Sequence, residues 1–224
     1  NTAVGALALY ANTTGTSNVA VGTTSLDANT TGNNITAVGY NALTANTTAS
    51  SNVAFGAYVL AANTTGASNV GLGKSALEKN TTAADNVAVG AFSLRCNVTG
   101  ANNTAVGSSA LNVNLGSNNT AVGKYTLVSN TTGACNTSVG KNSMLANTTG
   151  ANNVAMGALA LEANTTGFQN VAVGSLALIT NTTGQENTAV GYKAGICTTT
   201  GCGITAIGMC ALHCHTTGGD NNAI

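Results

Sequence analysis

A glycine that returns at a fixed interval constrains this chain more than any other feature. Every step is 17 residues except the 16 residues from 107 to 123, and the glycines stand at 5, 22, 39, 56, 73, 90, 107, 123, 140, 157, 174, 191 and 208. The unit reads N-x-A-V-G-x-x-A-L-x-x-N-T-T-G-x-x. Self-similarity at a short fixed period is the signature of solenoids and related repeat folds. The short copy has Asn114-Leu115-Gly116 where other copies have N-T-T-G, so its deletion falls in an expected turn.

The period excludes helical repeats. Solenoids of helix pairs use about 33 to 47 residues per repeat, and the unit is rich in Gly, Asn, Thr and Val, which are poor helix formers. We therefore predict an all-β protein, a parallel β-solenoid (β-roll) with one coil for each of the 13 glycines. Residues 1–224 are expected to form one continuous array within a longer fibre, and 192–224 its degenerate, cysteine-rich final coils.

Each coil is expected to contain two short strands and a turn. The first strand runs from the leading Asn to the glycine, as in 18–22, with its two larger residues on one face and its alanine on the other. The second strand carries the leucine, as in Leu26. N-T-T-G is the expected turn, in which Asn caps the backbone and Gly supplies a positive φ. The central glycine, present in every copy, predicts a corner where a Cβ would clash.

Coils stacked in register place like residues above like, about 4.8 Å apart. Columns of Asn and Thr then become ladders, and amide ladders form hydrogen bonds along the stacking axis. The polar groups of the turns are therefore expected to be satisfied from coil to coil.

The alanine column of the first strand is restricted to small residues, which predicts that a second surface packs against it. We interpret it as an oligomer interface, most simply of a homotrimer; tight packing within one chain is the alternative. The column consists of Ala3, Ala20, Ala37, Ala54, Ala88, Ala105, Ala121, Ala155, Ala172, Ala189 and Ala206, with Gly71 and Ser138 in the other two copies.

The strand motif, as in Asn119-Thr120-Ala121-Val122-Gly123, resembles the N-S-V-A-I-G repeats of trimeric autotransporter adhesin heads. It is also similar to the N-T-A-V-G-Y-x-A-L repeats of phage tail fibres, as at 187–192. The resemblance covers nearly the whole chain, and the sequence motifs that carry it are of low complexity. It implies a parallel β-roll that trimerises and serves surface attachment.

The N-T-T segments are also acceptor triplets for N-glycosylation, which takes place on exposed loops of secreted proteins. Two interpretations stay open: glycans that solubilise a surface poor in charge, or turn chemistry that repeats because the coil repeats. The candidate acceptors are Asn12, Asn29, Asn46, Asn63, Asn80, Asn97, Asn130, Asn147, Asn164 and Asn181.

Four of the six cysteines lie in the last coils. Cys197 could pair with Cys202 across one turn, or with Cys214, which occupies the same column one coil later at a spacing that a disulfide spans. Either pairing would imply an oxidising compartment. Cys96 and Cys135 are expected to be free or to bridge chains. No cysteine–histidine spacing matches a zinc template, so no metal site is predicted.

The composition disfavours several classes of function. Charged residues make up 5% of the chain and cancel to zero net charge, where ordinary domains have about 25%. No basic surface for nucleic acid is expected, and no apolar run could cross a bilayer. Acidic residues and histidines form no catalytic constellation, so neither enzyme activity nor a cofactor is expected.

These features favour a structural or adhesive fibre, extracellular or on a cell or virion surface. Its expected partners are further copies of itself, as a homotrimer or filament, and glycans or a cell-surface receptor. The alternatives are a self-polymerising matrix or sheath protein and, less favoured, an ice-binding solenoid. The last would need a flat threonine ladder, whereas Thr13 and Thr14 are adjacent in a turn.

Overall fold

The computed structural model describes residues 1–224 and forms an all-β parallel solenoid with a 17-residue repeat and no helix. It divides into two compact units, Asn1–Leu115 (unit 1) and Gly116–Ile224 (unit 2). The division falls inside the one shortened repeat. The repeat pattern itself continues through both units.

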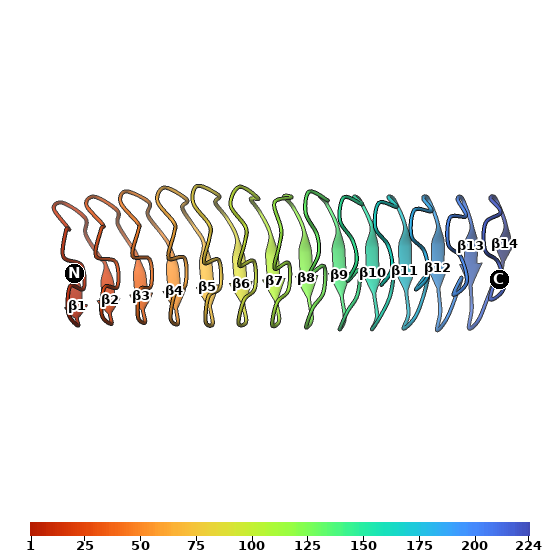
Figure 1. Ribbon diagram of the computed structural model, residues 1–224, viewed down its shortest axis with the longest axis horizontal. Helices are drawn as coiled ribbons and strands as arrows, with labels where there is room; N and C mark the ends of the chain where they lie inside the picture. Colours follow the sequence, from red (N-terminus) through yellow and green to blue (C-terminus); the bar gives the residue numbers. More distant parts are fainter. The chain divides into compact units, whose positions relative to one another are not determined.

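Each coil contributes one strand, and Figure 1 shows the strands of each unit lying side by side. The strands of unit 1 are β1 (Thr2–Val4), β2 (Val19–Val21), β3 (Thr36–Val38), β4 (Val53–Phe55), β5 (Val70–Leu72), β6 (Val87–Val89) and β7 (Thr104–Val106). Those of unit 2 are β8 (Thr120–Val122), β9 (Thr137–Val139), β10 (Val154–Met156), β11 (Val171–Val173), β12 (Thr188–Val190), β13 (Thr205–Ile207) and β14 (Asn222–Ala223).

Neighbouring strands within each unit are parallel and in register. Ala20 of β2 pairs with Ala37 of β3, and in unit 2 Ala172 of β11 pairs with Ala189 of β12. Equivalent residues of successive coils are therefore stacked, which confirms the predicted columns. A one-residue slip would exchange the inner and outer faces of the strand, so the alternation of sizes specifies the register.

The predicted second strand is absent. The segment that carries the leucine is a chain of turns in which two residues adopt left-handed backbone, as in Thr24 (φ 54°) and Leu26 (φ 53°). The amide of Leu26 donates to Ala42 of the next coil, whereas that of Thr24 donates to Ala6 of the previous coil. A left-handed leucine costs about 1–2 kcal/mol. Full burial of its side chain contributes about 1.5–3 kcal/mol, which offsets that cost.

The interior of each coil is narrow and lined by small and amide side chains. In the second coil the fully buried residues include Ala20, Ser25, Leu26 and Asn29. Leucine is thus the one large side chain that a typical coil buries. The larger strand residues, such as Val19, face outward instead.

The alanine column lies in this interior, so the predicted oligomer interface is wrong for these residues. Ala20, Ala37, Ala54, Ala88, Ala105, Ala121, Ala155, Ala172, Ala189 and Ala206 have no exposed surface in the single chain, and Ala3, in the first coil, is exposed. A side chain without accessible surface cannot contact a second chain. The small size is required because a larger group would meet the facing wall of the solenoid: a Cβ built on Gly71 lies 2.4 Å from a methyl of Val59 in the previous coil.

The central glycine forms the predicted corner. Gly90 has φ +129°, a region that side chains rarely adopt, and a Cβ built there would lie 2.7 Å from the carbonyl of Gly107 in the next coil. The glycine of N-T-T-G differs from expectation because its φ is not positive. Its smallness is needed for packing: a Cβ on Gly150 would lie 2.4 Å from the Gly167 oxygen. The left-handed turn residue comes two positions later, as at Asn152 (φ 58°).

The N-T-T-G asparagines form a buried ladder along each unit. Asn147 Nδ2 donates to Asn130 Oδ1 in the previous coil at 2.8 Å and to the Gly150 carbonyl of its own turn at 3.0 Å. Asn164 then donates to Asn147 in the same way at 2.8 Å. The predicted capping role of Asn and the predicted amide ladder are therefore both confirmed.

The leading asparagines form a second buried ladder. Asn153 Oδ1 accepts the backbone amide of Asn170 at 2.9 Å, and Asn153 Nδ2 donates to the Gly167 carbonyl at 2.9 Å. The ladder satisfies backbone groups that the turns would otherwise bury unpaired. This confirms the expectation that hydrogen bonds between successive coils pair the polar groups of the turns.

The first ladder ends at Asn181, two coils before the last central glycine, and we predict that extending it by one coil stabilises the protein. Asn181 Oδ1 and Thr198 Oγ1 are buried and have no hydrogen-bond partner. In Thr198→Asn the new amide would reach Asn181 Oδ1 and the Gly201 carbonyl, as its equivalents do in earlier coils. A satisfied buried acceptor is worth about 1–3 kcal/mol, so chemical denaturation should show a higher midpoint. Thr198→Val, which cannot donate, is the control; an equal gain in that variant would contradict the ladder explanation.

Candidate functional site

The first candidate surface is the outward strand face, defined as the first and third residues of each strand. These positions hold Val, Thr, Phe, Leu, Met and Ile in β1 to β13, and no charged residue. Several are substantially exposed, including Phe55 (52%) and Leu72 (45%) in unit 1 and Met156 (46%) in unit 2. Each unit therefore presents ordered columns of apolar and threonine side chains on a rigid parallel sheet.

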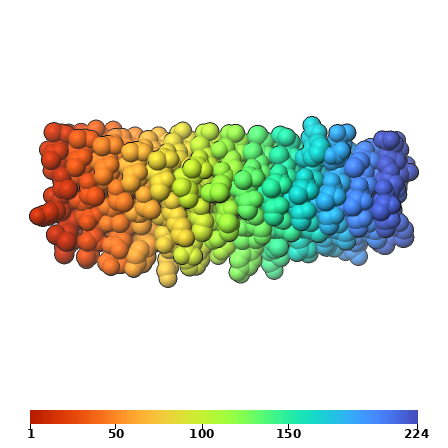
Figure 2. Space-filling model, turned by 45° about the horizontal axis from the view of Figure 1, so that its top comes forward, coloured from red at the N-terminus to blue at the C-terminus, as the bar shows by residue number.

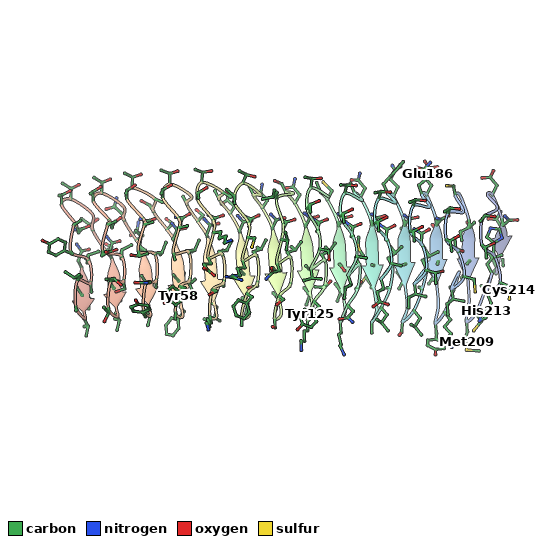
Figure 3. All side chains as sticks on the ribbon, in the orientation of Figure 1. Tyr58, Tyr125, Glu186, Met209, His213 and Cys214 are labelled. Atoms are coloured by element: carbon green, nitrogen blue, oxygen red, sulfur yellow. The ribbon has the colours of Figure 1, made fainter.

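The second candidate surface lies at the corner after the central glycine in unit 1. It gathers aromatic and charged side chains from four consecutive coils, and we call it the aromatic patch; its members are Tyr40, Tyr58, Lys74, Glu78, Phe92 and Arg95. Figure 3 shows Tyr58 projecting from this corner. The rings of Tyr40 and Tyr58 meet edge to face with centroids 5.3 Å apart.

Charged groups surround the phenyl ring of the aromatic patch. Arg95 Nε donates to Glu78 Oε2 at 2.8 Å, and the Arg95 guanidinium lies 5.5 Å from the Phe92 centroid. Lys74 Nζ lies 6.0 Å from the same centroid and forms no ion pair. Both distances are within the range of cation–π attraction. The ion pair thus holds Arg95 in place, while Lys74 keeps its charge available.

The neighbouring charges and hydrogen bonds shift the pKa of the Glu78 carboxyl. Desolvation raises the pKa of Glu78, but hydrogen bonds from Arg95 and Ser75 and the charges of Arg95 and Lys79 together lower it below its ordinary value. Desolvation and the proximity of Tyr40 and Glu78 raise the pKa of Tyr58. Glu78 is therefore ionised and Tyr58 protonated at neutral pH.

We predict that the Glu78 titration can be followed directly. In a carbon-detected NMR titration the pKa of Glu78 should lie below the ordinary value for a glutamate side chain and rise in Arg95→Gln. Because the folded-state pKa is depressed, the stabilisation is present above the unfolded-state pKa and lost as pH falls through the folded one. The pair is partly exposed, so the loss should stay below about 1 kcal/mol. An unchanged pKa in Arg95→Gln would contradict this account.

The predicted glycosylation sites lie mostly inside the coils, so this prediction is wrong for the folded protein. Asn12 is half-buried, and the other nine candidates have no exposed surface: Asn29, Asn46, Asn63, Asn80, Asn97, Asn130, Asn147, Asn164 and Asn181. Their Nδ2 atoms, where a glycan would be attached, donate to the ladder instead. The alternative interpretation, turn chemistry repeated by the coil, explains the motif.

The cysteines form no disulfide in the structure. Cys197, Cys202 and Cys214 are free thiols, as are Cys96, Cys135 and Cys210. Near the end of unit 2, His213 Nδ1 lies 3.5 Å from Cys214 Sγ, and His215 Nε2 lies 2.8 Å from the Gly218 carbonyl. In Figure 3, Met209 and His213 lie in the lower half of the view and Glu186 at its upper edge.

No group of three or more His, Cys, Asp or Glu side chains is placed to hold a metal ion, and the surface has no pocket. The face drawn in Figure 2 is correspondingly not hollowed within either unit. The structure also lacks any helix with the length and hydrophobicity of a membrane span.

The chain was compared with protein-family models, curated proteins and solved structures. No protein-family model matches the sequence, and neither the curated proteins nor the solved structures contain a match to it. The resemblance of the strand motif to adhesin heads and tail fibres therefore remains an expectation from short motifs.

Sequence reasoning missed both candidate surfaces. A three-residue strand does not reveal which of its two faces is enclosed, so the exposure of the apolar strand residues could not be predicted from the sequence. The aromatic patch had a visible signal: Tyr40, Tyr58, Lys74 and Phe92 occupy the two positions after successive central glycines. Variation in size and charge at these positions is also typical of a solvated surface, so the sequence alone did not distinguish them as a site.

Proposed function

We propose that this chain is a segment of a structural and adhesive fibre outside the cell or on a virion, and that it self-associates, most simply as a homotrimer. The observation that carries the proposal is the outward strand face. An ordered apolar face of this kind marks an interaction site on a soluble protein. Its complete lack of charge suits a second copy of the same face, since no unpaired charge would be buried on contact.

The construction of the coil also supports a mechanical role. Most coils bury one large side chain and two asparagines, so cohesion depends on contacts between successive coils. The stability of such a repeat protein is approximately the sum of the intrinsic stability of each repeat and the interaction energy between neighbouring repeats. The buried hydrogen-bond ladders resist sliding of one coil over the next. A stiff array that displays surfaces is what a fibre requires.

Sedimentation equilibrium of the full chain tests the proposal. The wild-type protein should sediment as an oligomer, and the double variant Phe55→Glu, Met156→Glu should sediment as a folded monomer because association would bury unpaired carboxylates. Ser68→Glu is the matched control, since Glu186 naturally occupies the equivalent turn position. A wild-type chain that is a stable, folded monomer at micromolar concentration would overturn the proposal.

A further inference from the structure

We propose that the aromatic patch of unit 1 binds an acidic oligosaccharide. The inference gives the proposed adhesive fibre a ligand class and a site, and it depends on residues away from the outward strand face. Neither the alanine column nor the N-T-T-G turns contribute to it.

The exposed tyrosines provide a stacking surface. Tyr40 is 49% exposed and Tyr58 is 38% exposed, and their edge-to-face contact holds each ring at a fixed angle to the other. The face of an aromatic ring carries negative potential. The C–H face of a pyranose carries the opposite partial charge, so sugar rings pack on such surfaces while their hydroxyls remain in water.

The charges of the patch select an acidic sugar. Lys74 and Arg95 flank Phe92 at 6.0 Å and 5.5 Å. The patch therefore has two cationic residues and one carboxylate, and that carboxylate is already paired with Arg95. A carboxylate on the ligand would find Lys74 without a competing partner. The paired Glu78 retains acceptor capacity for sugar hydroxyls.

The spacing of the patch suits an extended chain of sugars. Its members come from four consecutive coils, and neighbouring strands are about 4.8 Å apart, close to the length of one pyranose unit. Because the surface has no pocket, the ligand must lie along the corner and contact several coils. A single monosaccharide would reach only part of the patch and bind weakly.

Direct binding to the full chain tests this inference. Wild-type protein is applied to an array of oligosaccharides ending in or built from galacturonate, glucuronate or sialate, alongside neutral galactose and glucose oligomers. The best acidic ligand is then titrated calorimetrically. Tyr58→Ala and Lys74→Gln should each weaken its binding by about tenfold or more, and neutral oligomers of equal length should bind at least about tenfold more weakly than acidic ones.

Tyr125→Ala is the matched control, because Tyr125 stands at the same position of its repeat in unit 2, with Lys124 beside it. It should leave binding unchanged. Three results would each overturn the inference. The array could retain no acidic glycan, Tyr58→Ala and Tyr125→Ala could lose equal amounts of binding affinity, or neutral and acidic oligomers could bind equally well. Sedimentation of the same variants separates the two proposals: a monomer that binds acidic glycans would refute assembly alone, and an oligomer that binds none would refute the glycan site alone.

Discussion

Replacing Asn147 by alanine is expected to destabilise unit 2 strongly although it removes no charge and little volume. The side chain is fully buried and forms three ladder contacts, with Asn130, Gly150 and Asn164. Alanine would remove three buried hydrogen bonds, although the Gly150 carbonyl would still accept from Asn136 and Asn164 would still donate to Gly167. At about 0.5–1.5 kcal/mol for each lost hydrogen bond, the free energy of unfolding should fall by roughly 1.5–4.5 kcal/mol.

Urea denaturation followed by far-ultraviolet circular dichroism measures this loss. The matched control is Thr149→Ala, two residues away in the same turn but exposed, which should change stability by less than about 0.5 kcal/mol. Equal midpoints for Asn147→Ala and the wild type would show that the buried amide ladder contributes little to cohesion.

Gly90→Ala is expected to have an effect of similar size for a different reason. The backbone at φ +129° is strained for any residue with a Cβ, and the added methyl would lie 2.7 Å from the Gly107 carbonyl and 3.0 Å from the Ser108 amide nitrogen. These neighbours are backbone atoms of the next coil, so they cannot rotate away. Strain and clash together should cost at least about 3 kcal/mol, measured by the same denaturation experiment in unit 1.

Gly208→Ala separates strain from clash. Gly208 has φ +119°, but a Cβ built on it meets nothing within 4 Å. This variant should therefore lose only the strain energy, about 1–3 kcal/mol. If Gly208→Ala proves as damaging as Gly90→Ala, the contact with the next coil is not what requires glycine at this corner.

The sequence by itself was sufficient to predict the solenoid. The interval between central glycines excluded helices, and identical columns are what in-register parallel strands produce, as the pairing of Ala20 with Ala37 shows. The corner role of the central glycine and the capping role of Asn147 followed from residue chemistry. These predictions succeeded because each depends only on the spacing of the repeat and on the backbone preferences of glycine and asparagine, which the sequence states directly.

The tertiary structure alone decided which side of the strand faces inward. Alternation puts Ala20 and Val21 on opposite faces but does not say which face is enclosed, and the interpretation of the alanine column as an oligomer interface was wrong. The alanine column packs against the residues three positions after the central glycine: a Cβ built on Gly71 lies 2.4 Å from Val59, and Thr126 Oγ1 donates to Ser138 Oγ at 2.7 Å. The alanines and the N-T-T-G asparagines are therefore internal, and the valines remain outside on a surface that can meet another molecule.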